Sequence, residues 1–263
     1  MCDITQEELD QLKAAFQPLI GLKLSWLAIP DKALGGFEPS QLAVIVNTLL
    51  DGLLPQIQLL ALDDANKQKL AGIGLSKAPG VIGQRETYPD YVHVSGKRVE
   101  LKGLFVDNSK LKLKRPPTAR EPSARLKENI TLEVINPKTD ALLMAAAQIK
   151  CDEDGSCSPF IVDIEVFSMV ECVRARDNRL TSKGGRWHNG LPQVVKKKSI
   201  KKFRAGRHLS DNDYEKDNNF GKMARIPYAP LEAFMRKHGA LKVKKVRKKP
   251  STRIARSRRA SKR

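Results

Sequence analysis

Long hydrophobic runs are missing from this sequence of 263 residues. No stretch of 18 apolar residues occurs, so the sequence predicts no membrane span. Aromatic residues make up only 5% of the chain, yet a hydrophobic fraction of 41% is sufficient for a buried core. The first residues, MCDITQEELDQL, are acidic and lack the apolar segment of a signal peptide. These absences predict a globular protein that stays inside the cell.

Cysteine is also scarce, and its spacing excludes the common zinc and disulfide frameworks. The four cysteines are Cys2, Cys151, Cys157 and Cys172, and no two form a C-x-x-C pair. Four thiols in a chain of this length fit a reducing, cytoplasmic setting. Cys151 and Cys157 bracket CDEDGSC, which is expected to form a turn, and here we favour two free thiols over a cross-strand bridge. The four histidines are scattered without metal-ligand spacing, and no G-x-S-x-G motif suggests a serine hydrolase.

Acidic residues are outnumbered, with 29 Asp and Glu against 48 Lys and Arg. The last 23 residues hold six Lys, six Arg and no acid, which leaves a charge of +7 on the rest of the chain. Cations placed on phosphates release condensed counterions, so a basic protein favours a polyanionic partner. The alternative is a solvated tail that keeps the protein soluble.

Helical patterns occupy the first 70 residues. Thr5 and Glu8 form a capping box at the start of a helix that reaches Phe16. A longer helix is expected from residue 39 to about residue 60, kinked or ended near Gly52 and Pro55, with a further turn or two over 63–70. The glycine-rich stretch GIGLSKAPGVIG lacks the phosphate-loop spacing and is expected to be a plain loop.

Strand patterns follow in the middle of the chain. Alternation and β-branched residues predict strands over 91–94, 98–106, 130–135, 141–150 and 160–173. A Pro-rich and basic segment between the second and third strands is expected to be an exposed excursion. Near the C-terminus we expect a short helix over 230–237 and a disordered tail.

The stretch YPDYVHVSGKRVELKGLF, which contains the first two predicted strands, places the charged residues Asp90, Glu100 and Lys102 among apolar ones. A hairpin with a loop of Val94, Ser95 and a left-handed Gly96 places Asp90 opposite Glu100. Lys102 then lies on the same face, because side chains alternate along a strand.

Two carboxylates at this spacing repel each other unless a divalent cation lies between them. Mg²⁺ prefers oxygen ligands and commonly takes one or two protein carboxylates beside water and phosphate oxygens. Such a cation can activate water and stabilise charge on a phosphate. Lys102 would lie beside it, where an ammonium could orient the attacking water, help to deprotonate it or offset phosphate charge.

Pro89-Asp90 followed by Glu100-Leu101-Lys102 resembles the PD-(D/E)XK motif of the restriction-endonuclease-like nucleases. The resemblance covers residues 76 to 173 and implies an α/β fold, with a mixed β-sheet flanked by helices. It implies Asp90, Glu100 and Lys102 as the catalytic set and Mg²⁺ as the cofactor. Asp90 and Glu100 would be metal ligands, and Glu86 is offered as a further one.

The domain boundaries follow from these patterns. We expect a helical N-terminal region over 1–75, the nuclease-like core over 76–180 and a basic C-terminal region over 181–240. The tail over 241–263 is expected to be disordered.

The function implied by the resemblance is that of a type II restriction endonuclease that cuts double-stranded DNA, in a bacterial cytoplasm and as a homodimer. A nicking or repair nuclease of the same superfamily remains open, and so does a non-catalytic nucleic-acid-binding protein. The candidate phosphate contacts are Arg115, Arg120, Arg125, Lys196, Lys197, Lys198, Lys201, Lys202, Arg204 and Arg207.

Other polar residues on the strands have simpler interpretations. Asp163 and Glu165 share one face of an apolar strand and are expected to be outward-facing residues rather than metal ligands. Gln148 and Lys150 are candidates on the strand next to the site, but we favour a polar pair at a strand end.

Overall fold

The computed structural model describes most of the chain. The described residues are 3–24, 28–60, 63–79, 88–106, 108, 110–114, 124–218, 220 and 225–238. Three predictions fall outside these ranges: the metal ligand Glu86, the phosphate contacts Arg115 and Arg120, and the tail from residue 241.

Helices form the N-terminal part, as the sequence predicts. Helix α1 (Gln6–Phe16) begins at the capping box of Thr5, and α2 (Pro39–Leu53) ends in the 3₁₀ segment η3 (Leu54–Leu60), which contains Pro55. Helix α3 (Asp64–Ala71) is capped by the Asp63 side chain. Two shorter 3₁₀ segments, η1 (Gln17–Leu19) and η2 (Asp31–Gly36), connect the first helices to the sheet.

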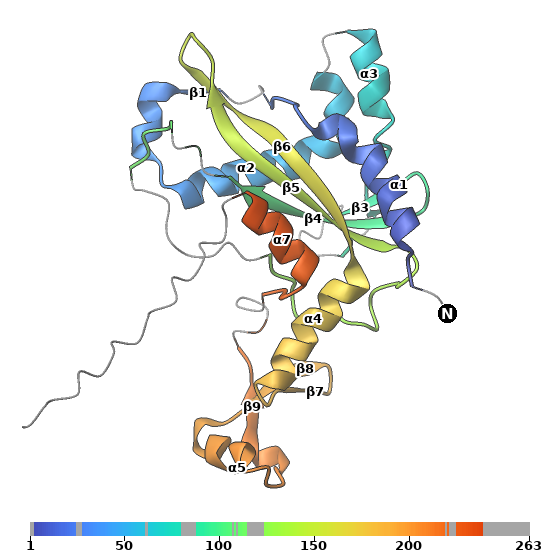
Figure 1. Cartoon of the computed structure of the whole chain (residues 1–263), viewed down its shortest axis with the longest axis vertical. Coiled ribbons are helices and arrows are strands. Elements are labelled where there is room, and N and C mark those ends of the chain that lie inside the picture. The colour runs from blue at the N-terminus through green and yellow to red at the C-terminus, as the bar shows by residue number, and fades with distance from the viewer. Residues whose placement is uncertain are drawn as a thin grey trace, which may run out of the picture.

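A six-stranded mixed sheet forms the centre of the molecule (Figure 1). Its strand order is β1-β6-β5-β4-β3-β2, and the β4–β5 pair alone among these is parallel. The strands are β1 (Ile29–Pro30), β2 (Leu75–Lys77), β3 (Tyr91–His93), β4 (Arg98–Phe105), β5 (Asp140–Cys151) and β6 (Ser156–Ser168). The expected mixed α/β architecture is therefore present.

Two hydrophobic clusters cover the two faces of this sheet. One combines residues of α1, α2 and η3 with Val99, Leu101 and Leu143. The other combines residues of α4 (Met169–Ser182) and α7 (Ala229–Lys237) with Leu104 and Met144. Because neighbouring residues of β4 alternate between the two clusters, the strand is buried on both faces.

Three expectations for secondary structure are wrong. Residues 75–77 form the edge strand β2 rather than loop. Residues 130–135 are turns, in which Val134 and Ile135 donate to the Thr131 carbonyl. Met169–Val173 begin helix α4, because the Ser168 side chain accepts from Glu171 N and caps the first turn.

Helix α4 extends away from the sheet to a small second sheet, seen at the bottom of Figure 1. This sheet has the order β7-β8-β9, and Asn189 and Gly190, both with positive φ, form the turn between its first two strands. Residues 183–218, which we call the basic lobe, contain β7 (Arg186–His188), β8 (Leu191–Val195), η5 (Lys197–Ser199), α5 (Ile200–Arg204), η6 (Asp211–Asp213) and β9 (Tyr214–Lys216).

The expectation of two free thiols at the β5–β6 turn is wrong. Cys151 and Cys157 are disulfide-bonded, and the ladder pairs them directly, with Cα atoms 3.9 Å apart. A cross-strand pair in this register brings the two Sγ atoms within bonding range. Cys172 is a buried free thiol, and burial raises its pKa. The expectation of a reducing compartment, which was based on four free thiols, therefore loses its support from the cysteines.

Helix length and polarity argue against a membrane span in the part of the chain that the structure describes. None of its helices combines the length and the apolar composition that crossing a bilayer requires.

Candidate metal and phosphodiester site

The β3–β4 hairpin has the predicted register. Tyr91 pairs with Val99 and Val92 with Arg98, and His93 N donates to the Lys97 carbonyl at 2.8 Å. Gly96 turns the chain with a φ of +79°. Continuing this register outward by one residue sets Asp90 opposite Glu100.

The Asp90 carboxylate is held at the start of β3 by the backbone of β4. Its Oδ2 accepts a hydrogen bond from Leu101 N at 2.7 Å. In a continued ladder this N–H would bond to the Pro89 carbonyl, so the side chain replaces a missing strand bond. On the other side, the Asp90 carbonyl accepts from Ala78 N at 3.2 Å. Asp90 thus has a structural role that orients its carboxylate toward β4.

Glu100 is a carboxylate in a buried position. It is only 4% exposed, and among the described residues Lys102 alone donates to it, from Nζ to Oε1 at 2.5 Å. The Lys102 side chain is 26% exposed and therefore links the buried carboxylate to solvent. The alternation places Glu100 and Lys102 on the same face of β4, as predicted.

The electrostatic environment of Glu100 disfavours its negative charge. Burial raises its pKa above the usual value, Lys102 opposes this shift, and the nearby Asp90 carboxylate adds to it. The Lys127 ammonium also lowers this pKa, although less than Lys102 does. A buried carboxylate whose charge is disfavoured in this way would gain from a bound cation.

A second, unpredicted network fixes the chain beside this site. Asp140, fully buried at the start of β5, accepts from the Tyr88 hydroxyl at 2.5 Å, from Arg98 Nε at 2.7 Å and from Thr139 Oγ1 at 2.8 Å. The Arg98 guanidinium also lies over the Tyr88 ring, 5.3 Å from its centre. Tyr88 precedes Pro89 and Asp90, so this network anchors the segment that carries the first carboxylate.

Sequence reasoning missed Tyr88, Arg98 and Asp140 because the network depends on the parallel β4–β5 pairing, which sets Arg98 beside Asp140. A partial signal was present, since Arg98 shares the alternating face of Glu100 and Lys102.

The donor set fits Mg²⁺ in number and chemistry. Two carboxylates with oxygen ligands supplied by water or phosphate are an ordinary Mg²⁺ set. Over the described residues, no group of three or more His, Cys, Asp or Glu side chains is arranged to hold a metal ion. Asp90 and Glu100 would therefore offer a cation two protein ligands rather than a full protein cage.

Asp163 and Glu165, the alternative acids, lie in ion pairs on β6. Asp163 Oδ2 lies 2.7 Å from Lys237 Nζ and 3.0 Å from His238 Nε2, at the C-terminal end of α7. Glu165 lies 2.8 Å from Lys13 Nζ of α1. These contacts agree with the interpretation of outward-facing polar residues and fasten two helices to the sheet.

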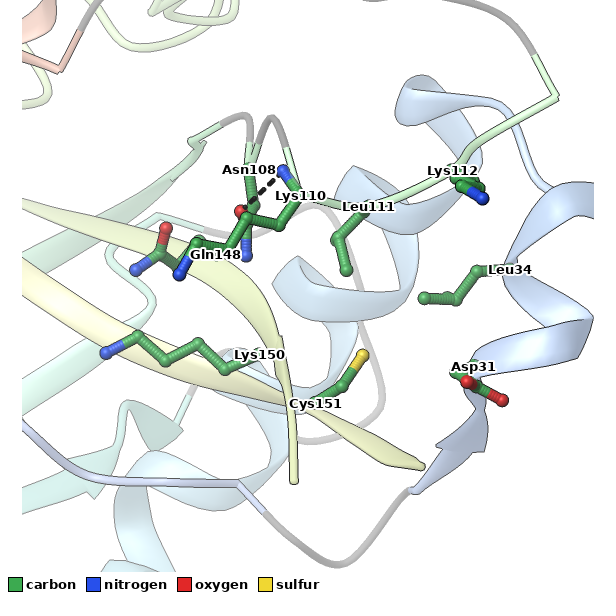
Figure 2. A pocket seen from close by; sticks show the side chains of 9 residues that line it. All are labelled: Asp31, Leu34, Asn108, Lys110, Leu111, Lys112, Gln148, Lys150 and Cys151. Atoms are coloured by element: carbon green, nitrogen blue, oxygen red, sulfur yellow. Dashed lines mark hydrogen bonds between the residues drawn. The ribbon is translucent and has the colours of Figure 1, made fainter. Parts of the chain in front are cut away.

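Gln148 and Lys150 lie on the neighbouring strand, but toward its far end. Met144 pairs with Lys102, and at about 3.3 Å per residue Gln148 lies about 13 Å beyond it. Both residues line an open hollow of about 670 Å³ that also includes Asp31, Lys110 and Cys151 (Figure 2). The Lys150 ammonium lies 3.5 Å from the centre of the Phe160 ring. This hollow is separate from the carboxylate pair.

The described candidate phosphate contacts lie in two places. Arg125 is exposed and forms a β-bridge with Arg225, outside the named strands. The other seven, from Lys196 to Arg207, all lie in the basic lobe.

Comparison with known proteins identifies no relative: no family model, no curated protein and no solved structure matches this chain.

Proposed function

We propose that this chain is a Mg²⁺-dependent endonuclease that hydrolyses phosphodiester bonds in double-stranded DNA, as a type II restriction endonuclease does. The observation that carries the proposal is the hairpin register, which sets Asp90 opposite a buried Glu100 with Lys102 on the same face. The resemblance of Pro89-Asp90 and Glu100-Leu101-Lys102 to the PD-(D/E)XK motif supports the same activity.

The side chains divide the chemistry between them. Asp90 and Glu100 would hold the cation, which supplies a water activated for attack and offsets negative charge on the phosphate. The attacking water would lose a proton as its oxygen forms the bond to phosphorus. The bond to the leaving oxygen would break, and that oxygen would take up a proton in exchange. Lys102 is paired with Glu100 as an ammonium, so its role is to orient the water and offset phosphate charge.

A homodimer would let two such sites cut both strands of a palindromic sequence. If one site acts alone, the same chemistry would cut a single strand, as in a nicking or repair nuclease. A non-catalytic nucleic-acid-binding protein is the second candidate, and the exposed cations of the basic lobe favour it.

A plasmid cleavage assay tests the proposal. Purified protein and supercoiled plasmid are incubated with Mg²⁺ or with EDTA, beside Asp90→Ala and Lys102→Ala variants. Glu153→Ala and Lys69→Ala are matched controls, because both residues are exposed and lie outside the β3–β4 hairpin. We expect Mg²⁺-dependent fragments that both site variants lose, by a factor of at least about 100, and both controls keep. If the protein binds the plasmid but cleaves it under no metal condition, the nuclease proposal is wrong and the second candidate, a non-catalytic nucleic-acid-binding protein, is supported.

A further inference from the structure

The basic lobe has more positively charged side chains than its own acidic residues can pair with. Residues 183–218 hold ten Lys and Arg against four Asp and Glu. Two of the acids are committed to internal ion pairs: Asp211 lies 2.7 Å from Arg186 Nη2, and Asp213 lies 2.7 Å from Lys202 Nζ. Asp213 also accepts from Ser199 Oγ and Ser210 N, which ties η5 to η6.

The remaining cations of the run point into solvent. Five of them are exposed and make no side-chain hydrogen bond or ion pair with any residue that the structure describes: Lys197, Lys198, Lys201, Arg204 and Arg207. We call these five the lobe cations. Lys197, Lys201 and Arg204 recur at the spacing of one helical face across η5 and α5. Like charges this close are unfavourable unless a polyanion neutralises them.

One buried side chain, Arg176, contacts both the lobe and the segment near the carboxylate site. Arg176 of α4 is fully buried, donates from Nη1 to the Lys127 carbonyl at 2.6 Å, and lies over the rings of Trp187 and Phe220. Trp187 belongs to β7 of the lobe, whereas Lys127 is close enough to Glu100 for its charge to act on it. Arg176 and Lys127 therefore connect the lobe to the part of the body that bears Asp90 and Glu100, and the lobe lies at the far end of the molecule from α3 (Figure 1).

The aromatic residues of the lobe are engaged in its own packing. Trp187 packs edge-on against Phe220, and the Arg186 guanidinium covers Tyr214 at 3.8 Å from the ring centre. The Phe203 ring lies against Gly184, where an added Cβ would be 2.9 Å from two ring atoms. Single-stranded nucleic acids are bound largely by stacking bases on free aromatic rings. Trp187 and Tyr214 are only partly exposed, and Phe203, 38% exposed, is the one exposed aromatic residue of the lobe. Five exposed cations beside a single exposed ring suit the backbone of a duplex better than stacked single-stranded bases.

We infer that the basic lobe is a docking module for the phosphate backbone of double-stranded DNA, and that the lobe cations make the contacts. Lys196, Lys202 and Arg186 have internal partners and serve to shape the lobe. Backbone contacts position a duplex without reading its sequence, so this module would hold the substrate beside the carboxylate pair and leave recognition to other residues. The choice of DNA rests on the proposed function.

Binding of labelled duplexes in EDTA separates this inference from cleavage. The full chain is titrated with a 20-bp duplex and with the corresponding single strand over a series of salt concentrations, by fluorescence anisotropy. The test variant is Lys201→Gln/Arg204→Gln. The matched control is Lys32→Gln/Lys69→Gln, which removes two exposed positive charges from η2 and α3. Thermal unfolding verifies that each variant is folded.

We expect the lobe variant to weaken duplex binding roughly tenfold and to reduce the slope of log K against log salt by about 1.8, as two lost phosphate contacts require. The control should change neither. An equal effect of the two variants, tighter binding of the single strand, or no duplex binding at all would each overturn the inference. A protein that binds the duplex through the lobe cations but never cuts it would refute the proposed nuclease activity and leave this inference standing.

Discussion

Glu100 shows at the scale of one residue why a strand buried on both faces would keep a carboxylate. Its position costs stability, because burial and the Asp90 charge both disfavour the ionised form. Proteins commonly accept such a cost at functional sites, where strained groups gain their partner only on binding. The Lys102 ammonium relieves part of this strain and does not remove it, since the pKa of Glu100 stays raised.

The Glu100→Gln variant should be more stable than the wild type in metal-free buffer. A folded-state pKa above the unfolded value of 4.5 means that the folded protein binds more protons, so wild-type stability falls as pH rises through that window. The advantage of the variant should therefore be absent below about pH 4.5, grow as pH rises and then level off. A gain of about 1 kcal/mol at pH 7 would raise Tm by roughly 2–4 °C.

Thermal unfolding of both proteins from pH 4 to pH 8 in EDTA measures this difference. Lys69→Gln provides a control at an exposed position of α3. A difference in Tm that stays constant across the whole range would show that the carboxyl group does not titrate in the way that its burial requires.

At the scale of the element, the hairpin could be predicted and its neighbours could not. Its register depends on local features, the left-handed Gly96 and the alternation of Val99, Glu100 and Leu101. The parallel β4–β5 pairing joins segments separated by more than 30 residues, and no local pattern specifies it. The start of α4 had a local signal that was overlooked, because Ser168 and Glu171 have capping-box spacing.

The network around Asp140 is the element-scale feature with a consequence for function. The Tyr88 hydroxyl bonds to Asp140 just before Pro89 and Asp90, so it fixes the path of the chain into β3. Tyr88→Phe keeps the ring under Arg98 and removes only this bond. Outer partners of metal ligands typically contribute a factor of 10–100 in metal affinity.

We therefore expect Tyr88→Phe to weaken Mn²⁺ binding about tenfold while the far-UV circular dichroism spectrum stays unchanged. Titration calorimetry gives the affinity, and thermal unfolding gives the loss of stability separately. Lower stability with an unchanged Mn²⁺ affinity would assign Tyr88 a structural role alone.

At the scale of the whole molecule, charge is divided between a sheet that bears the carboxylate pair and a lobe that bears unpaired cations. The sequence identified the basic run but could not separate its members, because the partners Asn212 and Asp213 follow it and contact Lys196 and Lys202 only in the folded lobe. Arg176 joins the two parts through contacts that span the body, α4 and the lobe.

Arg176→Met should loosen the lobe without unfolding the sheet. Loss of a buried, hydrogen-bonded guanidinium typically costs about 3–5 kcal/mol, and here the cost falls on the contact between α4 and Trp187. In a Trp26→Phe background, emission from Trp187 should shift to longer wavelength, and limited proteolysis should cut first within residues 183–218. Cleavage that begins in the six-stranded sheet would place Arg176 in the main core instead.

The most direct test of the central claim is a Mn²⁺ titration followed by calorimetry, with the wild type, Asp90→Asn, Glu100→Gln and the exposed control Glu153→Gln. If Asp90 and Glu100 share one cation, the wild type and the control should each bind Mn²⁺ at a common site that both single variants lose. A wild type without such a site, or variants that retain it, would contradict the account.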